Sequence, residues 1–434
     1  MLFNEVIYQI YPLGFCGAPS ANDGKTVSRI RRVIDWIPYL RKLGITAVLF
    51  NPVFESDRHG YDVRDYSRID CRLGTNDDFA DVCDSLHEAG IKVILDASYN
   101  HVGRGFFGFQ DVLKNREQSK YTDWFFLDFT QNGRDGFTYA DWEGHGELVK
   151  LNLQNETVIR YLLGRTDQWI GEFGIDGLRL DVAYMLDKDF IRRLSTHIHA
   201  HTPDFLLIGE HTGAGYHELL GENMLNCVTN YELRGELIRS FNDRNMHILS
   251  DLLDRQFGRG HGEYEYCQLL NFADNHDINR IASELGSSGN LTALYALLFS
   301  IPGIPCLYYG SEWGEKGKRR PFSDKPLRPS FTRPKHNSLS TLITTLCEIH
   351  RTYSVFHSGD FNIITRQDRQ LIFRRRSQRG QLTFALNADK SPAVIHADFE
   401  VGQGMDLITK KKITFSGEIT LEPESVYLWY TDWL

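Results

Sequence analysis

The chain contains the stretch Gly174-Ile175-Asp176-Gly177-Leu178-Arg179-Leu180-Asp181-Val182-Ala183, which is typical of a buried strand that ends in an acid. Its leucines and valine supply the apolar run that a parallel strand covered on both faces requires. Arg179 and Asp181 lie inside that run, and either charge alone would be costly to bury. Two interpretations are open: an inert internal ion pair, or a functional acid at a strand end. The other strand ends of the chain have to distinguish them.

Further stretches share this apolar strand character, and helical patterns separate them. The expected strands begin near residues 6, 45, 91, 175, 205, 224, 268 and 304. Helical spacing of apolar residues is clear over residues 30–40, 77–87 and 156–173. Strands and helices in alternation indicate a parallel α/β sheet. Eight such strands predict a (β/α)8 TIM barrel, whose functional groups lie at the C-terminal ends of the strands.

The alternation is interrupted once and ends before the C-terminus. Residues 102–152 form a long irregular excursion rich in Gly, Asp, Trp and Phe, which predicts an inserted, loop-rich domain after the third strand. Residues 356–434 hold short alternating runs without a helical period, which predicts a C-terminal antiparallel β-sandwich domain. The barrel is assigned to residues 1–101 and 153–355.

Composition excludes several classes of function. The 434 residues carry a formal net charge of −9, and nucleic-acid binding needs concentrated Lys and Arg, so no nucleic-acid partner is expected. The one basic run, Lys316-Gly-Lys-Arg-Arg320, is short and predicts a solvated loop. No stretch is long enough to span a bilayer, so no membrane partner is expected.

Cysteine usage and the start of the chain bear on location. The seven cysteines are scattered and form no CxxC pair, which indicates neither a disulfide framework nor a structural zinc site. The opening Met1-Leu-Phe-Asn-Glu5 lacks the basic and apolar regions of a secretion signal. We therefore expect a cytoplasmic protein.

Four of the predicted barrel strands end in an acid: Asp96, Asp181, Glu210 and Asp277. Because parallel strands end at one rim of a barrel, these carboxylates should lie close together, where repulsion and burial separate their pKa values. Separated pKa values suit glycosidic cleavage, in which one carboxylate attacks while a protonated carboxyl group protonates the departing oxygen.

The stretches around these acids resemble the four signature regions of the α-amylase family of glycoside hydrolases. The matching stretches are Asp96-Ala-Ser-Tyr-Asn-His101, Gly177-Leu-Arg-Leu-Asp181, Gly209-Glu210 and Asn275-His276-Asp277. The resemblance implies the family's barrel, its inserted domain and its C-terminal β domain. It also implies Asp181 as nucleophile, Glu210 as general acid/base and Asp277 as a third acid that binds sugar hydroxyls and favours a distorted ring.

The resemblance further assigns substrate-binding roles to Tyr61, as the stacking tyrosine in His59-Gly-Tyr-Asp62, to His101 and His276, and to Arg179. Arg179 is expected to hold Asp181 ionised, because a guanidinium lowers the pKa of a carboxyl group beside it. For a retaining enzyme the Asp181 and Glu210 carboxyl groups should lie about 5–5.5 Å apart. Each of these side chains could instead have a purely structural role, but their joint pattern favours function.

Two departures from the family pattern concern metal binding and specificity. Endo-acting relatives commonly carry Lys and His three and four positions after the nucleophile, where this chain has Tyr184 and Met185. That His helps to hold a structural calcium together with the residue matching Asn100. A backbone carbonyl from Met185 could serve equally well, so calcium stays open, but no cofactor is expected to be required and no metal ligand is assigned.

Other matches point to a substrate. Val149-Lys-Leu-Asn152 resembles the form of the family's fifth region found in cyclomaltodextrinases, neopullulanases and maltogenic amylases, and residues 303–314 resemble its eighth strand. The chain starts at the barrel, without the N-terminal β domain through which those enzymes usually dimerise, so its oligomeric state is left open.

The sequence thus predicts a retaining hydrolase of α-1,4 bonds in maltooligosaccharides, with cyclodextrins and pullulan as further candidate substrates. The nearer alternative is an α-glucan transglycosylase or an α-1,6-acting relative with the same catalytic residues. The more distant one is a non-catalytic carbohydrate-binding protein on the same fold.

Overall fold

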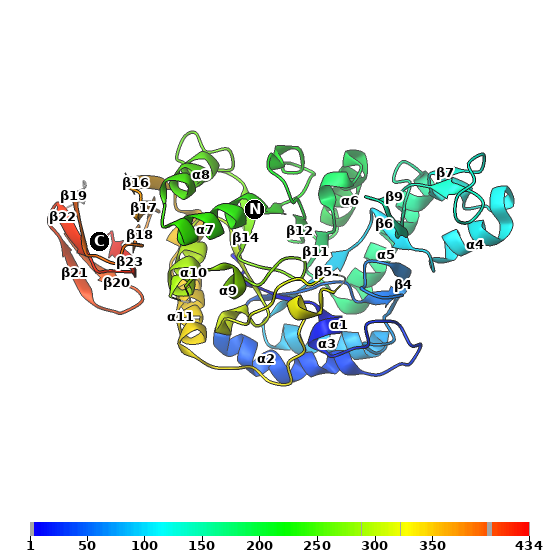
Figure 1. Ribbon diagram of the computed structural model, residues 1–434, viewed down its shortest axis with the longest axis horizontal. Helices are drawn as coiled ribbons and strands as arrows, with labels where there is room; N and C mark the ends of the chain where they lie inside the picture. Colours follow the sequence, from blue (N-terminus) through cyan, green and yellow to red (C-terminus); the bar gives the residue numbers. More distant parts are fainter. Residues whose placement is uncertain (1–3, 288, 322, 397–401, 434) are drawn as a thin grey trace.

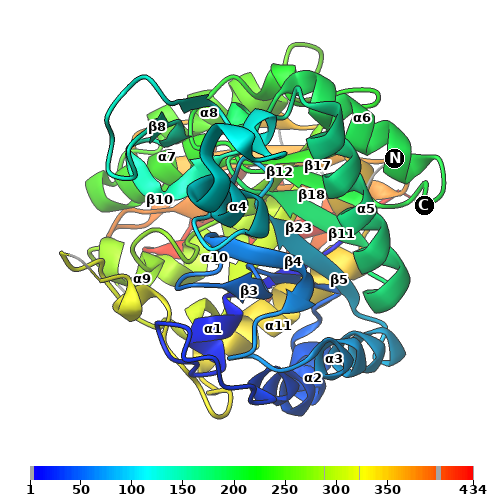
Figure 2. The same cartoon turned by 90° about the vertical axis from the view of Figure 1, so that its right-hand side faces the viewer.

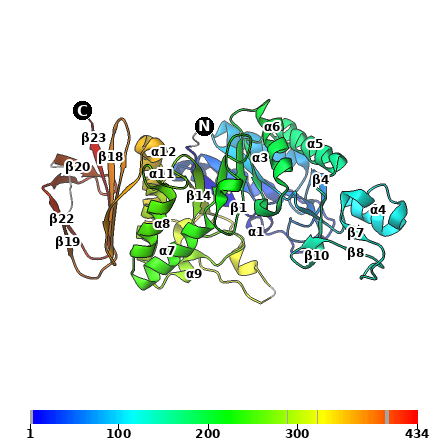
Figure 3. The ribbon, with the colours of Figure 1, turned by 90° about the horizontal axis from the view of Figure 1, so that it is seen from above.

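The computed structural model describes residues 4–287, 289–321, 323–396 and 402–433. Residues 1–3, which belong to the N-terminal stretch in which no secretion signal is expected, lie outside the described residues. Figure 1 shows a barrel at the centre, a β-sheet at one end of the long axis and an inserted segment at the other. Figure 3, seen from above, shows the same arrangement.

Eight parallel strands form a closed barrel in the order β1-β15-β14-β13-β12-β11-β5-β2, which confirms the predicted TIM barrel. The strands are β1 (Ile7–Ile10), β2 (Ala47–Phe50), β5 (Lys92–Ala97), β11 (Gly177–Leu180), β12 (Leu206–Gly209), β13 (Cys227–Thr229), β14 (Gln268–Phe272) and β15 (Ile304–Tyr308). All eight lie where the sequence places them. They are short and buried along their length, as expected for strands with a filled interior and a helical shell.

The barrel interior and the shell around it form two separate apolar clusters. The interior is filled by alternate residues of the strands, among them Leu49, Ile94, Ile208 and Phe272. The opposite faces pack against the surrounding helices in a much larger cluster. Alternation along each strand thus buries both faces, so every polar side chain at a strand end is directed to the rim.

The helices around the barrel are α2 (Arg32–Leu43), α3 (Asn76–Glu88), α5 (Glu156–Phe173), α6 (Lys188–His199), α7 (Tyr231–Asp243), α8 (His247–Phe257), α10 (Asn290–Ser300) and α11 (Ser338–Thr352), with short helices α1 (Pro12–Phe15), α9 (Ile281–Glu284) and α12 (Val355–Ser358). Helix α5 has the predicted bounds. It begins after Asn155, whose side chain accepts from two backbone N–H groups, and ends at Gly174, which has a φ of 62°. Gly174 is therefore a helix cap rather than part of the strand.

One unit of the barrel lacks its α-helix. Residues 210–226, all of them described, connect β12 to β13 through a single 3-10 turn (Tyr216–Glu218). Gly213, Gly215 and Gly221 lie in this connection, and glycine in a helix interior costs about 1 kcal/mol relative to alanine. In this unit a loop therefore takes the place of the α-helix that would pack on the outside of the barrel.

The inserted and C-terminal segments are antiparallel. The insertion contains the sheet β6 (His101–Gly103), β10 (His145–Lys150) and β9 (Asp141–Trp142), the pair β7 (Leu127–Asp128) and β8 (Thr138–Tyr139), and helix α4 (Phe107–Asn115). Figure 2 views the molecule from this end, with α4 in front of the barrel. A further pair, β3 (Phe54–Ser56) and β4 (Val63–Ile69), was not anticipated.

The C-terminal sheet has six strands, β16 (Asn362–Arg366), β17 (Gln370–Arg376), β18 (Gly380–Asn387), β23 (Ser425–Asp432), β20 (Gly402–Asp406) and β21 (Lys412–Phe415), with a separate pair β19 (Ala393–His396) and β22 (Glu418–Leu421). The two sheets enclose their own apolar cluster. The exact domain limits remain predictions. No helix in the described residues is long and apolar enough to cross a bilayer.

Candidate active site

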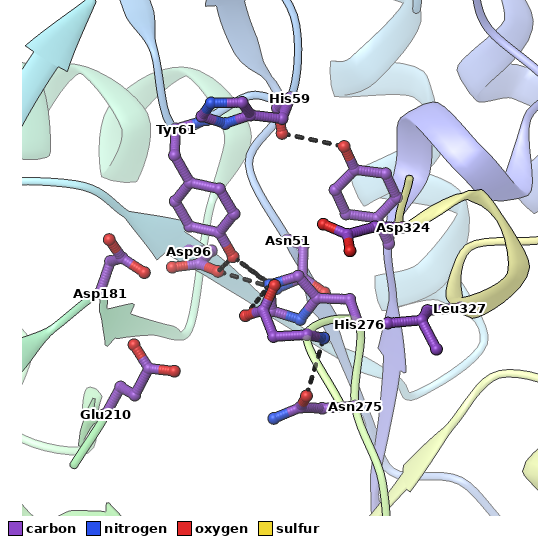
Figure 4. A network of polar contacts seen from close by, with 12 residues as sticks. Asn51, His59, Tyr61, Asp96, Asp181, Glu210, Asn275, His276, Asp324 and Leu327 are labelled. Carbon is purple, nitrogen blue, oxygen red and sulfur yellow. Dashed lines mark hydrogen bonds and ion pairs between the residues drawn. The ribbon is translucent and has the colours of Figure 1, made fainter. Parts of the chain in front are cut away.

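Strand register brings the predicted acids to one rim of the barrel. In the parallel ladder Arg179 of β11 lies opposite Asp96 of β5, and Asp181 and Glu210 directly follow β11 and β12. Asp181 and Glu210 are both almost fully buried, with 6% and 5% of their surfaces exposed. Figure 4 shows their two carboxyl groups next to one another. The sequence prediction that these acids lie together is therefore matched by the geometry.

A single guanidinium group connects three of the carboxylates. Arg179 Nη1 lies 2.7 Å from Asp96 Oδ2 and 2.9 Å from Asp181 Oδ1, and its Nη2 lies 2.6 Å from Glu210 Oε1. Charge-assisted contacts of this kind are among the stronger hydrogen bonds in proteins. Arg179 therefore fixes the relative positions of the three acids, and it does not serve Asp181 alone.

The charge balance of this cluster differs from the expectation that Arg179 keeps Asp181 ionised. Burial, together with the charges of Glu210, Asp96 and Asp277, raises the pKa of Asp181 well above its usual range, although Arg179 opposes the shift. One guanidinium group faces three buried carboxyl groups, so at Asp181 burial and the repulsion from its neighbours outweigh the attraction of Arg179.

Asp277 has a different environment on the neighbouring side of the site. Its Oδ2 lies 2.9 Å from His276 Nε2, and its Oδ1 lies 2.9 Å from Arg328 Nη2. Burial alone would raise the pKa of Asp277, but His276 and Arg328 lower it well below its usual range. Asp277 thus stays ionised over the whole neutral pH range, and its side chain is 35% exposed toward the pocket.

Tyr61 and His276 lie next to one another beside Asp96, as Figure 4 shows. The rings stack with centroids 5.6 Å apart, and the Tyr61 hydroxyl lies 2.5 Å from His276 Nε2 and donates to Asp96 at 2.9 Å. Asn51 also donates to Asp96, at 2.8 Å. Tyr61 also borders the pocket.

His101 also lies where the sequence predicts, with Nε2 3.9 Å from Asp181 Oδ2. Burial lowers the pKa of His101 to about 3, with His59 and His145 adding to the effect. The ring is therefore neutral near pH 7, and it can exchange hydrogen bonds with hydroxyl groups without adding charge to the site.

Asp181, Glu210, Asp277, Tyr61 and His101 line a pocket of about 790 Å³. Arg179 and His276 are buried and are not among the residues that line it. Sequence reasoning missed several of its residues, which are Thr212, Tyr231, Arg319, Arg320, Ser323, Asp324 and Arg328. The basic run expected to be a solvated loop therefore contributes Arg319 and Arg320 to the pocket. Tyr184, one of the two departures from the family pattern, also borders it, together with Trp142 of the insertion. Met185 is not among the residues that line the pocket.

Val182, directly after Asp181, has a backbone conformation rare for its residue type. Its φ of 42° and ψ of 46° lie in the left-handed region, which a β-branched residue seldom adopts. This conformation directs its N–H toward Glu210 Oε2, at 3.0 Å. Strain of this kind is held where a functional geometry requires it, here to aim the carboxyl group of Glu210.

Residues 9–355 match the family model for the α-amylase catalytic domain. The chain belongs to the α-amylase family. It is accordingly a glycosidase, and the match spans the barrel with all four of its rim acids.

Within the α-amylase family the chain is similar to cyclomaltodextrinases and to a neopullulanase. It is 31% identical over 419 residues to a cyclomaltodextrinase of a Bacillus species, covering 89% of this chain and 73% of that one. It is 35% identical over 348 residues to neopullulanase 2 of Thermoactinomyces vulgaris, covering 74% and 58%. A solved cyclomaltodextrinase structure superposes with a TM-score of 0.84 at 27% identity, covering 98% and 78%.

The structural calcium ion that the α-amylase resemblance left open stays a prediction, and one oxygen atom in the structure bears on it. Asn100 Oδ1 is buried without a hydrogen-bond partner, which offers one oxygen to a cation. Calcium takes six to eight oxygen ligands, and the one cluster of acidic or sulfur ligands in the described part of the chain lies elsewhere, at Glu55, Asp70 and Cys71. Asp70 in that cluster is already paired with Arg72 at 2.6 Å. The reaction proposed for this site uses no metal ion.

Proposed function

We propose that the chain is a retaining hydrolase of α-1,4-glucosidic bonds in maltooligosaccharides, with cyclodextrins and pullulan as further substrates. The observation that carries the proposal is the pair Asp181 and Glu210, which face one pocket from neighbouring strand ends and share the guanidinium of Arg179. Double displacement at a sugar requires two such carboxyl groups, one as the nucleophile and one as the acid.

In the proposed reaction Asp181 attacks the anomeric carbon while Glu210 gives its proton to the departing glycosidic oxygen. The bond to the leaving sugar breaks as a covalent glucosyl–Asp181 ester forms. Glu210, now ionised, then takes a proton from water, and the resulting hydroxide attack releases the sugar and restores Asp181. Asp277 and His101, which line the pocket, bind hydroxyl groups of the donor sugar, and their contacts strengthen as the ring distorts.

In the proposal, one wall of the pocket binds the donor sugar and the other wall binds the acceptor sugar. Tyr184 and Thr212, which follow Asp181 and Glu210 by three and two residues, line the pocket together with Trp142, and we assign all three to the side of the leaving group. Aromatic side chains of this kind pack against sugar rings. The names of the similar cyclomaltodextrinase and neopullulanase support a short or cyclic α-glucan as the substrate.

We extend the proposal to a cytoplasmic location. All seven cysteines are unpaired in the structure, five of them buried, and this fits a reducing compartment. Maltodextrins that enter a cell are then the natural substrate, rather than granular starch.

A product analysis tests the proposal. The wild-type protein and Asp181→Asn are incubated with maltotriose, β-cyclodextrin, pullulan and panose, and the products are separated by chromatography. Shorter sugars from the wild type alone are expected. Products longer than the starting sugar would favour a transglycosylase, and cleavage of the α-1,6 bond of panose would favour the α-1,6-acting relative. Turnover of none of the four would refute the hydrolase and favour a binding protein.

A further inference from the structure

Arg328 is a pocket residue that no sequence motif identifies, and it has an unusually complete set of contacts. Its Nη2 lies 2.9 Å from Asp277 Oδ1 and 3.5 Å from Asp324 Oδ2. Its Nε donates to the backbone oxygen of His276 at 3.0 Å. The guanidinium lies over the ring of Tyr11, 4.4 Å from the centroid, and the side chain is only 13% exposed. Every edge of the group is therefore occupied.

The backbone around Arg328 is held as firmly as the side chain. Tyr308 and Tyr309, at the end of β15, donate to the carbonyl groups of Leu327 and Pro329 at 3.1 and 2.8 Å. A Cβ atom on Gly14 would lie 2.5 Å from the Arg328 oxygen, so this segment packs directly on the backbone of α1. Arg328 thus reaches Asp277 from a rigid base.

Asp277 needs a cation of its own. Arg179 is committed to Asp96, Asp181 and Glu210, all within 2.9 Å. Among the residues that the structure describes, only His276 and Arg328 lie within ion-pair distance of Asp277. His276 and Arg328 both lower the pKa of Asp277, and the charge of Arg328 persists at every pH near neutrality because a guanidinium stays protonated.

The approach of the guanidinium also fixes an orientation. Arg328 occupies Oδ1 while His276 occupies Oδ2, so neither carboxylate oxygen can rotate away without losing a contact. Each oxygen keeps a second lone pair for a ligand in the pocket. We infer that Arg328 is a positioning residue that fixes the carboxylate of Asp277 toward the hydroxyl groups of the donor sugar. This inference rests on the function proposed above.

The alternative is that Arg328 only anchors its loop, and the chain offers a matched control. Arg32 donates to Ser330 Oγ at 2.9 Å and to the oxygen of Phe15 at 3.0 Å, so it ties the same segment to the barrel without an ion pair to Asp277. Arg32→Met therefore removes an anchor of the loop, whereas Arg328→Met also removes the partner of the carboxylate.

A double-mutant cycle with Asp277→Asn tests the inference on maltotriose hydrolysis. We expect Arg328→Met to lower kcat by about 10- to 100-fold with KM within about threefold, because the contact acts in the transition state. We expect Arg328→Lys to restore part of the loss, and Arg32→Met to change kcat by less than about threefold. In a protein that already carries Asp277→Asn, Arg328→Met should lower kcat by less than about a further threefold.

Independent losses that multiply in the double variant would overturn the inference, as would a wild-type kcat in Arg328→Met or equal losses in Arg32→Met and Arg328→Met. If Arg328→Met does not fold, as judged by circular dichroism, the same cycle is run with Arg328→Lys. Wild-type protein without turnover would remove the proposed function and this inference with it. If the wild-type protein is active but the kcat losses of the two single variants multiply in the double variant, the inference is overturned and the proposed function stands.

Discussion

Glu312 is a fully buried acid behind the site, and replacing it with glutamine should change how stability depends on pH. Its Oε1 accepts hydrogen bonds from Tyr8 at 2.7 Å and Tyr39 at 3.1 Å, and its Oε2 accepts from the Gly310 N–H at 2.8 Å. Burial raises the pKa of Glu312 from 4.5 to about 7, although these hydrogen bonds oppose the shift. The folded protein therefore holds a proton there that the unfolded chain releases.

The sign and size of the effect follow from that shift. Because the folded pKa of Glu312 is the higher one, its contribution to stability is fully present below pH 4.5 and is lost as the pH rises toward 7. The rise of the Glu312 pKa from 4.5 to about 7 corresponds to about 3 kcal/mol of folding free energy, since one pKa unit corresponds to about 1.4 kcal/mol. Most of that loss, about 2–3 kcal/mol, falls between pH 5 and pH 8.

Glu312→Gln imitates the protonated acid, since its amide group can donate to Tyr8 and Tyr39 while its oxygen accepts from Gly310. The free energy of unfolding of both proteins is measured in urea at pH 5 and pH 8. From the lower to the higher pH, we expect the wild type to lose about 2–3 kcal/mol relative to the variant. Parallel values for the two proteins would refute the reasoning, because they would show that Glu312 does not take up a proton on folding.

Three further predictions concern the site. Asp181→Asn and Glu210→Gln should each lower kcat on maltotriose by several orders of magnitude with an unchanged circular dichroism spectrum; near-normal activity in either would contradict its assigned role. Trp142→Ala or Tyr184→Ala should raise KM for maltotriose by about 3- to 10-fold through lost ring contact on the acceptor side, and an unchanged KM would place the acceptor elsewhere. Since no metal ion is expected to be required, EGTA should leave the thermal unfolding midpoint where calcium chloride leaves it, and a shift of several degrees would contradict this.

The barrel could be predicted from sequence because each strand is a short apolar run covered on both faces. Helix α5 was predicted with its observed bounds because an asparagine cap and a terminal glycine mark its two ends. The connection of residues 210–226 could not be predicted in the same way, since a missing helix leaves no periodic signal. The pair β3 and β4 was also missed, because Tyr61 between these strands was interpreted as part of a binding motif rather than as part of a hairpin.

The acids of the site could be predicted because they follow recognisable strands, whereas their partners could not. Arg328 lies 51 residues from Asp277 in the sequence, and only the fold brings the two within hydrogen-bond distance. Arg319 and Arg320 were interpreted as part of a solvated basic run, since composition alone cannot tell whether a charged loop borders a pocket. Charge balance is likewise a property of the assembled site, and for this reason the pKa of Asp181 was expected in the wrong direction.

The position of Arg179 between the two acids, rather than beside Asp181 alone, suits the proposed reaction. Its Nη1 contacts Asp181 and its Nη2 contacts Glu210, while Asp96 balances its charge throughout. As the ester forms, negative charge leaves Asp181 and appears on Glu210, which has lost its proton. A cation serving Asp181 alone would stabilise the nucleophile before attack and so raise the barrier. Arg179, which contacts both acids, loses the charge of Asp181 as a partner while it gains that of Glu210. The net charge of the site therefore stays constant while the glycosidic bond is exchanged for the ester bond.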